Sequence, residues 1–186
     1  DLHVRSRRQR QMCIRDRHIA CTGIRDLNLE NNAALETLAC YRCPITNLNV
    51  SHNPELENLE CGETQIKHLD VSKLANLQSL SCNSLEIESL DLSSNKKLET
   101  LFVDFVEHIS SIDLSNNVAL KELYCSQAKI TSLDVSKNIA LSVLGCDRTD
   151  ITSLDVSKNV ALEWLDCDGT DITSLDVSKN VALEWL

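Results

Sequence analysis

The chain has little of what tight ligand-binding turns require, with four glycines and two prolines among 186 residues. It contains no H-E-x-x-H zinc motif and no glycine-rich phosphate loop. Its five histidines stand in unrelated sequence surroundings: His3, His18, His52, His68 and His108. These absences predict that the protein is not an enzyme and that it uses no metal and no cofactor.

Long apolar runs and positive charge are also scarce. No run approaches the roughly 18 residues that span a bilayer, so we expect no membrane insertion of this chain. Its 18 basic residues against 28 acidic residues give a formal net charge of −10. That charge argues against nucleic acid or an anionic membrane as a partner.

What the chain has instead is a repeat. Each cysteine of the repeat is followed by an isoleucine five residues later and is preceded by leucines five and two residues earlier. One coil, between the third and fourth of these cysteines, has Val103 in place of cysteine and one extra residue before Ile109. We count eight coils, of which the first and last are incomplete. The cysteines are 21 residues apart, or 43 across the coil that has Val103: Cys40, Cys61, Cys82, Cys125, Cys146 and Cys167.

The pattern L-x-x-L-x-C-x-x-T-x-I-T-S-L-D-V-S-x-N-x-x resembles the leucine-rich repeat family over roughly residues 19–186. Within that family it is most similar to internalin-type cell-surface proteins of bacteria that carry a cysteine ladder. The resemblance implies a repeat solenoid with a parallel β-sheet on the concave face and short strand/turn or 3₁₀ segments on the convex side. It also implies a secreted or cell-surface protein, although the architecture itself serves many binding roles.

Alternation of apolar and variable residues predicts which side chains face the core. Leu165 and Cys167 are expected to point inward. The alternate residues Trp164, Asp166 and Asp168 are expected to point outward. A second alternating run at 175–177 indicates a strand-like segment on the return side.

The cysteine column is interpreted as a hydrophobic spine. Thiols stacked against leucines behave as small apolar groups with raised pKa values and little reactivity. Disulfides between neighbouring rungs are not expected, because parallel side chains point the same way. Cys40 and Cys43 form a C-x-x-C, but Cys43 falls in a column of threonines and no second pair completes a metal or redox site.

Two polar columns are expected to bond to backbone. The threonine column, Thr22, Thr64, Thr149 and Thr170, is expected to supply a hydroxyl hydrogen bond. The second column consists of asparagines that stand in turns. Leu74 takes the place of one of them, and we expect its turn to be altered. The asparagine column is expected to satisfy turn backbone in its own and neighbouring coils: Asn32, Asn53, Asn95, Asn117, Asn138, Asn159 and Asn180.

A column of aspartates stacks like charges at about 5 Å, which is repulsive. Lys137, Lys158 and Lys179, together with a serine column, are expected to offset the repulsion. A calcium-binding ridge is the alternative, although calcium takes six to eight oxygens around one ion. The aspartates are Asp70, Asp91, Asp113, Asp134, Asp155 and Asp176.

Both ends of the chain differ from the regular repeat. Residues 1–17 are rich in arginine, lack the leucine columns and resemble a translated sequencing adapter, so we expect a non-native segment there and the solenoid over 18–186. Residues 151–165 and 172–186 are the same fifteen letters, and the chain stops inside a predicted strand. We therefore expect a fragment of a longer protein.

The functional hypothesis rests on the outward strand positions. Five of the six aromatic residues are predicted there, namely Tyr41, Phe102, Tyr124, Trp164 and Trp185, among acidic residues that include Glu60. Rigid rings in a polar surround are typical of a binding surface. The predicted ligand-binding residues are Phe102, Asp104, Glu122, Tyr124, Asp147, Trp164, Asp166, Asp168 and Trp185.

Two binding functions and one passive role stay open. The first is recognition of a protein, such as a host or cell-surface protein, by an acidic and aromatic concave face. The second is a carbohydrate-binding adhesin module, in which Tyr124, Trp164 and Trp185 stack on sugar faces. The third is a structural spacer.

Overall fold

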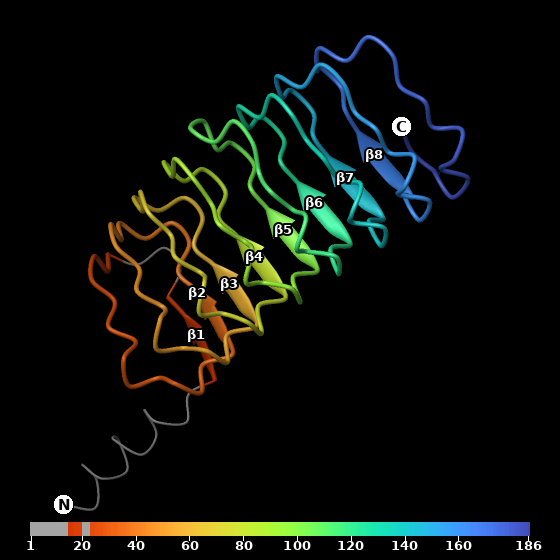
Figure 1. Cartoon of the computed structure of the whole chain (residues 1–186). Coiled ribbons are helices and arrows are strands. Elements are labelled where there is room, and N and C mark those ends of the chain that lie inside the picture. Colours follow the sequence, from red (N-terminus) through yellow and green to blue (C-terminus); the bar gives the residue numbers. More distant parts are fainter. Residues whose placement is uncertain (1–14, 20–22) are drawn as a thin grey trace, which may run out of the picture.

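The computed structural model describes residues 15–19 and 23–186, and in it the chain winds into a stack of coils with one short strand per coil (Figure 1). The strands are parallel and pair in chain order. An isolated bridge between Trp164 and Trp185 extends the pairing into the last coil. This is the predicted solenoid, with strands β1 (Asp16–His18), β2 (Thr37–Ala39), β3 (Asn58–Glu60), β4 (Ser79–Ser81), β5 (Thr100–Phe102), β6 (Glu122–Tyr124), β7 (Val143–Gly145) and β8 (Trp164–Asp166).

The repeat length sets the register of the sheet. From β2 onward, the central leucine of each strand pairs with the central leucine of the next, as Leu38 does with Leu59. Leu101 pairs with Leu123, 22 residues on, in the same way. The extra residue before Ile109 is therefore absorbed in the return segment and leaves the sheet unbroken.

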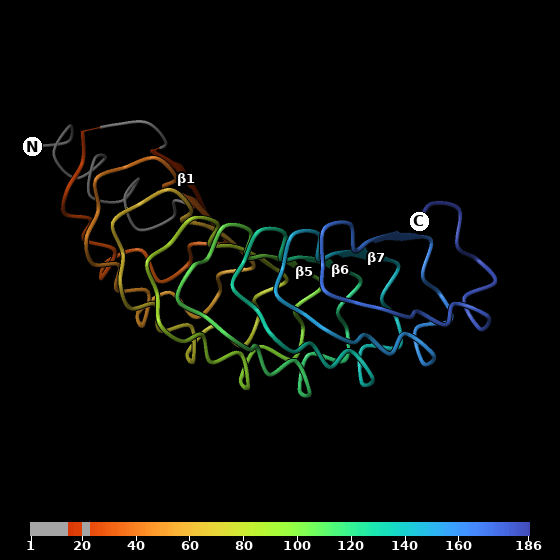
Figure 2. The same cartoon turned by 90° about the horizontal axis from the view of Figure 1, so that it is seen from above.

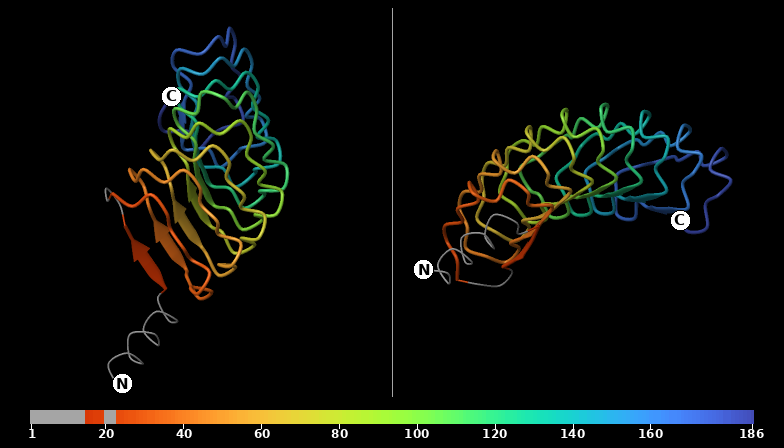
Figure 3. Two further views of the ribbon diagram at one scale, coloured as in Figure 1. Left: turned by 90° about the vertical axis from the view of Figure 1, so that its left-hand side faces the viewer. Right: turned by 90° about the horizontal axis from the view of Figure 1, so that it is seen from below.

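The strands lie on the inner side of a curved stack, and the return segments lie on its outer side (Figures 2 and 3). The return segments of the described residues are made of turns and extended chain. Their expected alternation is present, because Leu48 and Val50 are buried and Asn49 is exposed, but they form no second sheet. The described part of the chain has no helix, so no helix there could cross a membrane.

The thiol column belongs to the aliphatic core. Cys40, Cys61, Cys82, Cys125 and Cys146 are fully buried, and Cys167 is partly exposed. Burial raises the pKa of Cys40, Cys82 and Cys146 to about 12. The expected raised pKa is confirmed, and the spine consists of neutral, apolar thiols. Cys43 is also buried, and its Sγ donates to the carbonyl of Ile19 at 2.9 Å. No group of three or more His, Cys, Asp or Glu residues in the described ranges is placed to hold a metal ion.

Buried asparagines tie each coil to the one before it. The Nδ2 of Asn138 donates to the carbonyls of Leu114 at 3.2 Å and Asn117 at 2.8 Å. The same pair of bonds recurs at Asn53, Asn95, Asn117, Asn159 and Asn180. The predicted backbone-binding role is confirmed, and the bonds run between coils, which explains why a lone coil lacks stability.

The turn at Leu74 keeps the geometry of the asparagine turns. Its N–H donates to Val71 at 3.0 Å and its carbonyl accepts from Leu77 at 3.1 Å, as at each asparagine. The expected alteration of this turn was wrong, because backbone bonds define the turn and a buried leucine fills the amide's space. The threonine hydroxyls bond as expected: those of Thr64, Thr149 and Thr170 donate to the carbonyl three residues earlier. Thr22 lies outside the described residues.

Strand β1 begins at Asp16, within the arginine-rich segment that the sequence sets apart. Arg17 pairs with Leu38 in the sheet, and Arg15 forms an ion pair with Glu36. Residues 1–14 lie outside the described residues. The non-native origin of the segment stays a prediction.

Candidate functional site

Two columns of outward side chains run along the concave face, one from the first and one from the third residue of each strand. The buried central leucine of each strand from β2 to β8, such as Leu123 or Leu165, anchors the backbone and turns its neighbours outward. Phe102 and Tyr124 occupy the third position of β5 and β6. Trp164 occupies the first position of β8, and Trp185 is paired with it.

These four aromatic side chains form one continuous stack, which we call the ring ladder. The rings of Phe102 and Tyr124 are stacked with centroids 4.7 Å apart and planes inclined by 6°. Those of Trp164 and Trp185 are stacked at 4.9 Å and 14°. Between the two pairs, Tyr124 and Trp164 approach to 6.3 Å with a tilt of 42°. Sequence reasoning placed these residues on one face but did not predict their mutual stacking.

Gly145 allows the two pairs to meet. It is the third residue of β7, between Tyr124 in β6 and Asp166 in β8. A Cβ at this position would lie 3.3 Å from Tyr124 Cδ1 and 3.3 Å from Trp164 Cζ3. Sequence reasoning missed Gly145. The available signal was a glycine at an outward strand position between aromatic coils, where no turn requires one.

The stacking decides which part of each ring meets solvent. Within each stacked pair, one face of every ring is covered by its partner. The tilted contact of Trp164 with Tyr124 occupies the space between the pairs. The ladder therefore presents mainly ring edges, while free faces occur only toward its two ends.

Carboxylates surround the ring ladder. The Oδ1 of Asp104 accepts from the backbone N–H of Ser126 at 2.8 Å, yet burial raises the pKa of Asp104. Burial and the charges of Glu122 and Asp104 raise the pKa of Tyr124, so both carboxylates act on its hydroxyl. Asp166 Oδ1 accepts from the N–H of Asp168 at 3.1 Å. We call Asp104, Glu122, Asp147, Asp166 and Asp168 the acidic surround.

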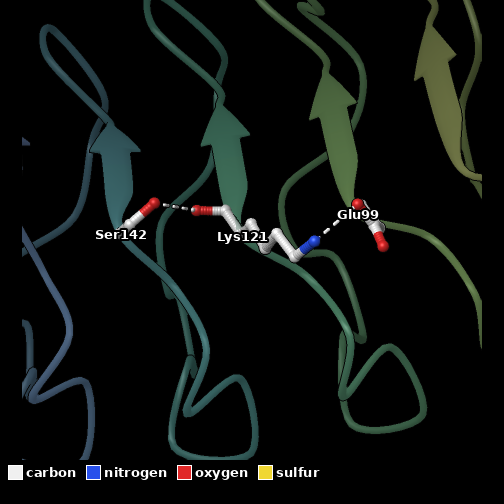
Figure 4. Close-up of polar contacts among 3 residues, drawn as sticks. All are labelled: Glu99, Lys121 and Ser142. Carbon is white, nitrogen blue, oxygen red and sulfur yellow. Dashed lines mark hydrogen bonds and ion pairs between the residues drawn. The ribbon is translucent and has the colours of Figure 1, made fainter.

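Five cations of the described residues form ion pairs with carboxylates outside the acidic surround, namely Arg15, Arg42, Lys67, Lys121 and Lys129. Lys121, which directly precedes β6, extends its Nζ to Glu99 in the preceding coil at 2.7 Å (Figure 4). The Oγ of Ser142 donates to the Lys121 carbonyl from the other side at 3.2 Å (Figure 4). Among the described residues, no carboxylate of the acidic surround forms an ion pair. The carboxylates that do are Glu36, Glu63, Glu86, Glu99 and Asp150.

Two further aromatic residues lie apart from the ladder. Tyr41 is the second residue after β2, the position that Asp104, Asp147 and Asp168 hold in later coils, and the coils of β3 and β4 separate it from Phe102. Glu60 ends β3, two strands from Phe102. Phe105 is 50% exposed in the turn after β5, at a residue with a φ of 58°. These positions restrict the aromatic surface to the coils of β5 to β8 and the coil that follows.

The aspartate column lies on the return side, where its charges are stabilised locally. Asp155 Oδ1 accepts from the N–H of Ser157 at 2.9 Å, and the same bond forms at every column aspartate. Bonds from the serine backbone and hydroxyl lower the pKa of Asp155, and Lys158 adds a smaller effect. The predicted offset by serines and lysines is supported, with the serines contributing most. Asn49 takes the same role toward Ser51.

Comparison with solved structures gives the same fold. The functional domain of InlJ from Listeria monocytogenes, described as including a cysteine ladder, is 36% identical with a TM-score of 0.82, over 84% of this chain and 35% of that chain. A leucine-rich repeat protein of Leptospira interrogans is 17% identical with a TM-score of 0.78, over 85% of this chain and 44% of that one. The internalin InlF of Listeria monocytogenes is 19% identical with a TM-score of 0.69, over 96% of this chain and 68% of that one. The chain thus spans about a third of the InlJ domain. No family model and no curated protein matches it.

Proposed function

We propose that this chain, a leucine-rich repeat solenoid similar to the cysteine-ladder internalins, is a non-enzymatic module that recognises another protein through its concave face. The binding surface consists of the ring ladder and the acidic surround. We infer further that the parent protein is a secreted or surface-anchored bacterial protein and that its ligand is a host or cell-surface protein. The similarity to internalins supports this location.

The observation that carries the proposal is the continuous ring ladder on the open face of the sheet. Trp185 is 48% exposed, and Phe102, Tyr124 and Trp164 are partly exposed. Large rigid rings supply contact area at low entropic cost, which is why they dominate protein interfaces. The rings are not needed to fill the core, which is aliphatic.

The geometry favours a protein over a glycan. Sugars stack on the faces of aromatic rings, and the faces inside the ladder are covered by neighbouring rings. Apolar side chains of a protein can pack against ring edges without such a requirement. The carbohydrate-binding alternative therefore retains only the outer faces at the ends of the ladder.

The test compares Trp164→Ala with Phe105→Ala on arrays of purified extracellular proteins and of glycans. Phe105 is an exposed aromatic residue outside the ladder, so it controls for loss of a ring. We expect protein binding that falls by about thirtyfold in W164A, that is unchanged in F105A and that weakens with added salt. Trp164-dependent, salt-insensitive binding to glycans would establish the adhesin alternative. No Trp164-dependent binding on either array would establish a spacer.

A further inference from the structure

We propose that the partner of this surface is a basic segment, which places apolar side chains on the edges of the ring ladder and lysine or arginine side chains on the acidic surround. This inference rests on the proposed function and specifies the chemistry of the ligand. It commits to a protein segment with positive charge, rather than to a neutral or an acidic one.

The first argument is that, among the described residues, no cation forms an ion pair with the carboxylates of the acidic surround. Five carboxylates gather around the ladder, and none of them is ion-paired, whereas Arg42, Lys67, Lys121 and Lys129 pair with carboxylates elsewhere. Asp147 and Asp168 occupy equivalent positions in adjacent coils, where parallel strands lie about 4.8 Å apart. Their mutual repulsion would be relieved by cations from a partner.

The second argument is the chemistry of the outward positions. The first and third residues of β5 to β8 include no lysine and no arginine. The positions two residues beyond these strands hold Asp104, Ser126, Asp147 and Asp168. Each of these four coils thus places at least one carboxylate and no cation at these positions, and complementary charge both steers association and excludes acidic partners.

The third argument separates the roles of rings and carboxylates. A cation is attracted to the face of an aromatic ring, and the faces inside the ladder are covered. Basic groups are consequently directed to the carboxylates, and apolar groups to the ring edges. Asp104 is one such carboxylate beside a ring. Its charge contributes to the raised pKa of Tyr124, and its Oδ1 accepts a hydrogen bond from the backbone N–H of Ser126.

The experiment is a selection of random linear peptides displayed on phage against the purified chain. The informative variant is D147N/D166N/D168N, which removes three charges and retains the Oδ1 acceptors. The matched control, D134N/D155N/D176N, removes three charges from the aspartate column. Asn49 occupies the same column in an earlier coil, and its Oδ1 accepts from the N–H of Ser51 as the aspartates do from their serines. An asparagine therefore fits the geometry at the three control positions. W164A serves as the test of the proposed function in the same selection.

We expect the enriched peptides to be rich in lysine, arginine and aliphatic residues. A synthetic copy of the best peptide should bind D147N/D166N/D168N about tenfold more weakly than wild type, and bind the control triple variant almost as well as wild type. Peptides that require Trp164 but are neutral or acidic would overturn the inference and leave the proposed function standing. Equal weakening by both triple variants would overturn the inference, because general charge would then explain the binding. Enrichment that never depends on Trp164 would overturn the proposed function as well.

Discussion

The ring of Trp164 reaches the ring of Tyr124, although the two residues belong to coils that are not neighbours. Their centroids are 6.3 Å apart, across the coil that contributes Gly145. A single missing side chain thus joins two stacked pairs into one surface. The consequences of this relationship, and of the columns that support it, can be measured without knowledge of the ligand.

Replacing Gly145 with valine should separate the two pairs. The new side chain would enter the space now shared by Tyr124 and Trp164, where its Cβ alone would lie 3.3 Å from an atom of each ring. We expect the coupling energy between these two residues, about 0.5–1.5 kcal/mol in a double-mutant cycle, to fall to near zero in the G145V background. Glu60→Val, at the equivalent position of β3, is the control and should leave the coupling intact. Unchanged coupling in G145V would show that the rings do not meet across this glycine.

Asn138→Ala should destabilise the solenoid by about 2–4 kcal/mol, because it removes two buried hydrogen bonds and leaves a cavity. Asn138→Leu should cost less, since Leu74 occupies the equivalent position with the same backbone bonds. Urea unfolding followed by circular dichroism measures both. A leucine variant less stable than the alanine variant would contradict the interpretation of the Leu74 turn.

The thiol spine should make stability sensitive to alkali. Burial raises the pKa of Cys82 to about 12, against about 8.5 for an unfolded thiol. The contribution of the buried neutral thiol is therefore present below about pH 8.5 and is lost as the pH rises toward about 12. The stability advantage of wild type over Cys82→Ala should shrink between about pH 7 and about pH 11, because other titrating groups are common to both proteins. A constant advantage across this range would mean that the folded thiol ionises normally.

The aspartate column should affect stability in the opposite pH range. Bonds from Ser157 lower the pKa of Asp155, so its contribution is present above the unfolded pKa of about 3.9 and is lost as the pH falls through the lower folded value. We expect Asp155→Ala to lower the urea midpoint at neutral pH and Asp155→Asn to preserve it, since the amide oxygen can accept the same bond. The difference between wild type and D155A should disappear in acid. Equal losses in both variants at neutral pH would show that charge, not the serine bond, is what matters.

The sequence predicted most of the fold because each prediction concerned a repeated column. Leu165 was assigned to the core and Trp164 to the surface from the alternation of apolar residues alone, and Leu165 is buried while Trp164 is partly exposed. Cys167, also expected to point inward, is partly exposed. Asn138 was expected to bond backbone, and it does. The Leu74 turn was judged wrongly, because a single replaced side chain does not reveal that the backbone bonds of the turn persist.

Other features depended on contacts between coils that no column reveals. Tyr41 shares its column with Asp104 and Asp147, yet it takes no part in the ring ladder, whose contacts begin at Phe102. The pairing of Lys121 with Glu99 depends on which way a long side chain turns between two coils. Gly145 carries no side chain to attract notice, so its role emerges only when its two aromatic neighbours are placed in space.

By itself the sequence determined the period, the direction of each side chain and the composition of the concave face, because a backbone that repeats every coil converts sequence position directly into a place on the surface. Only the tertiary structure decided that the aromatic residues cover one another, present their edges and leave five carboxylates without internal ion pairs in the described chain. The physical reason is that ring stacking and ion pairing depend on torsion angles and on distances between neighbouring coils, which vary with each pair of side chains and not with the repeat.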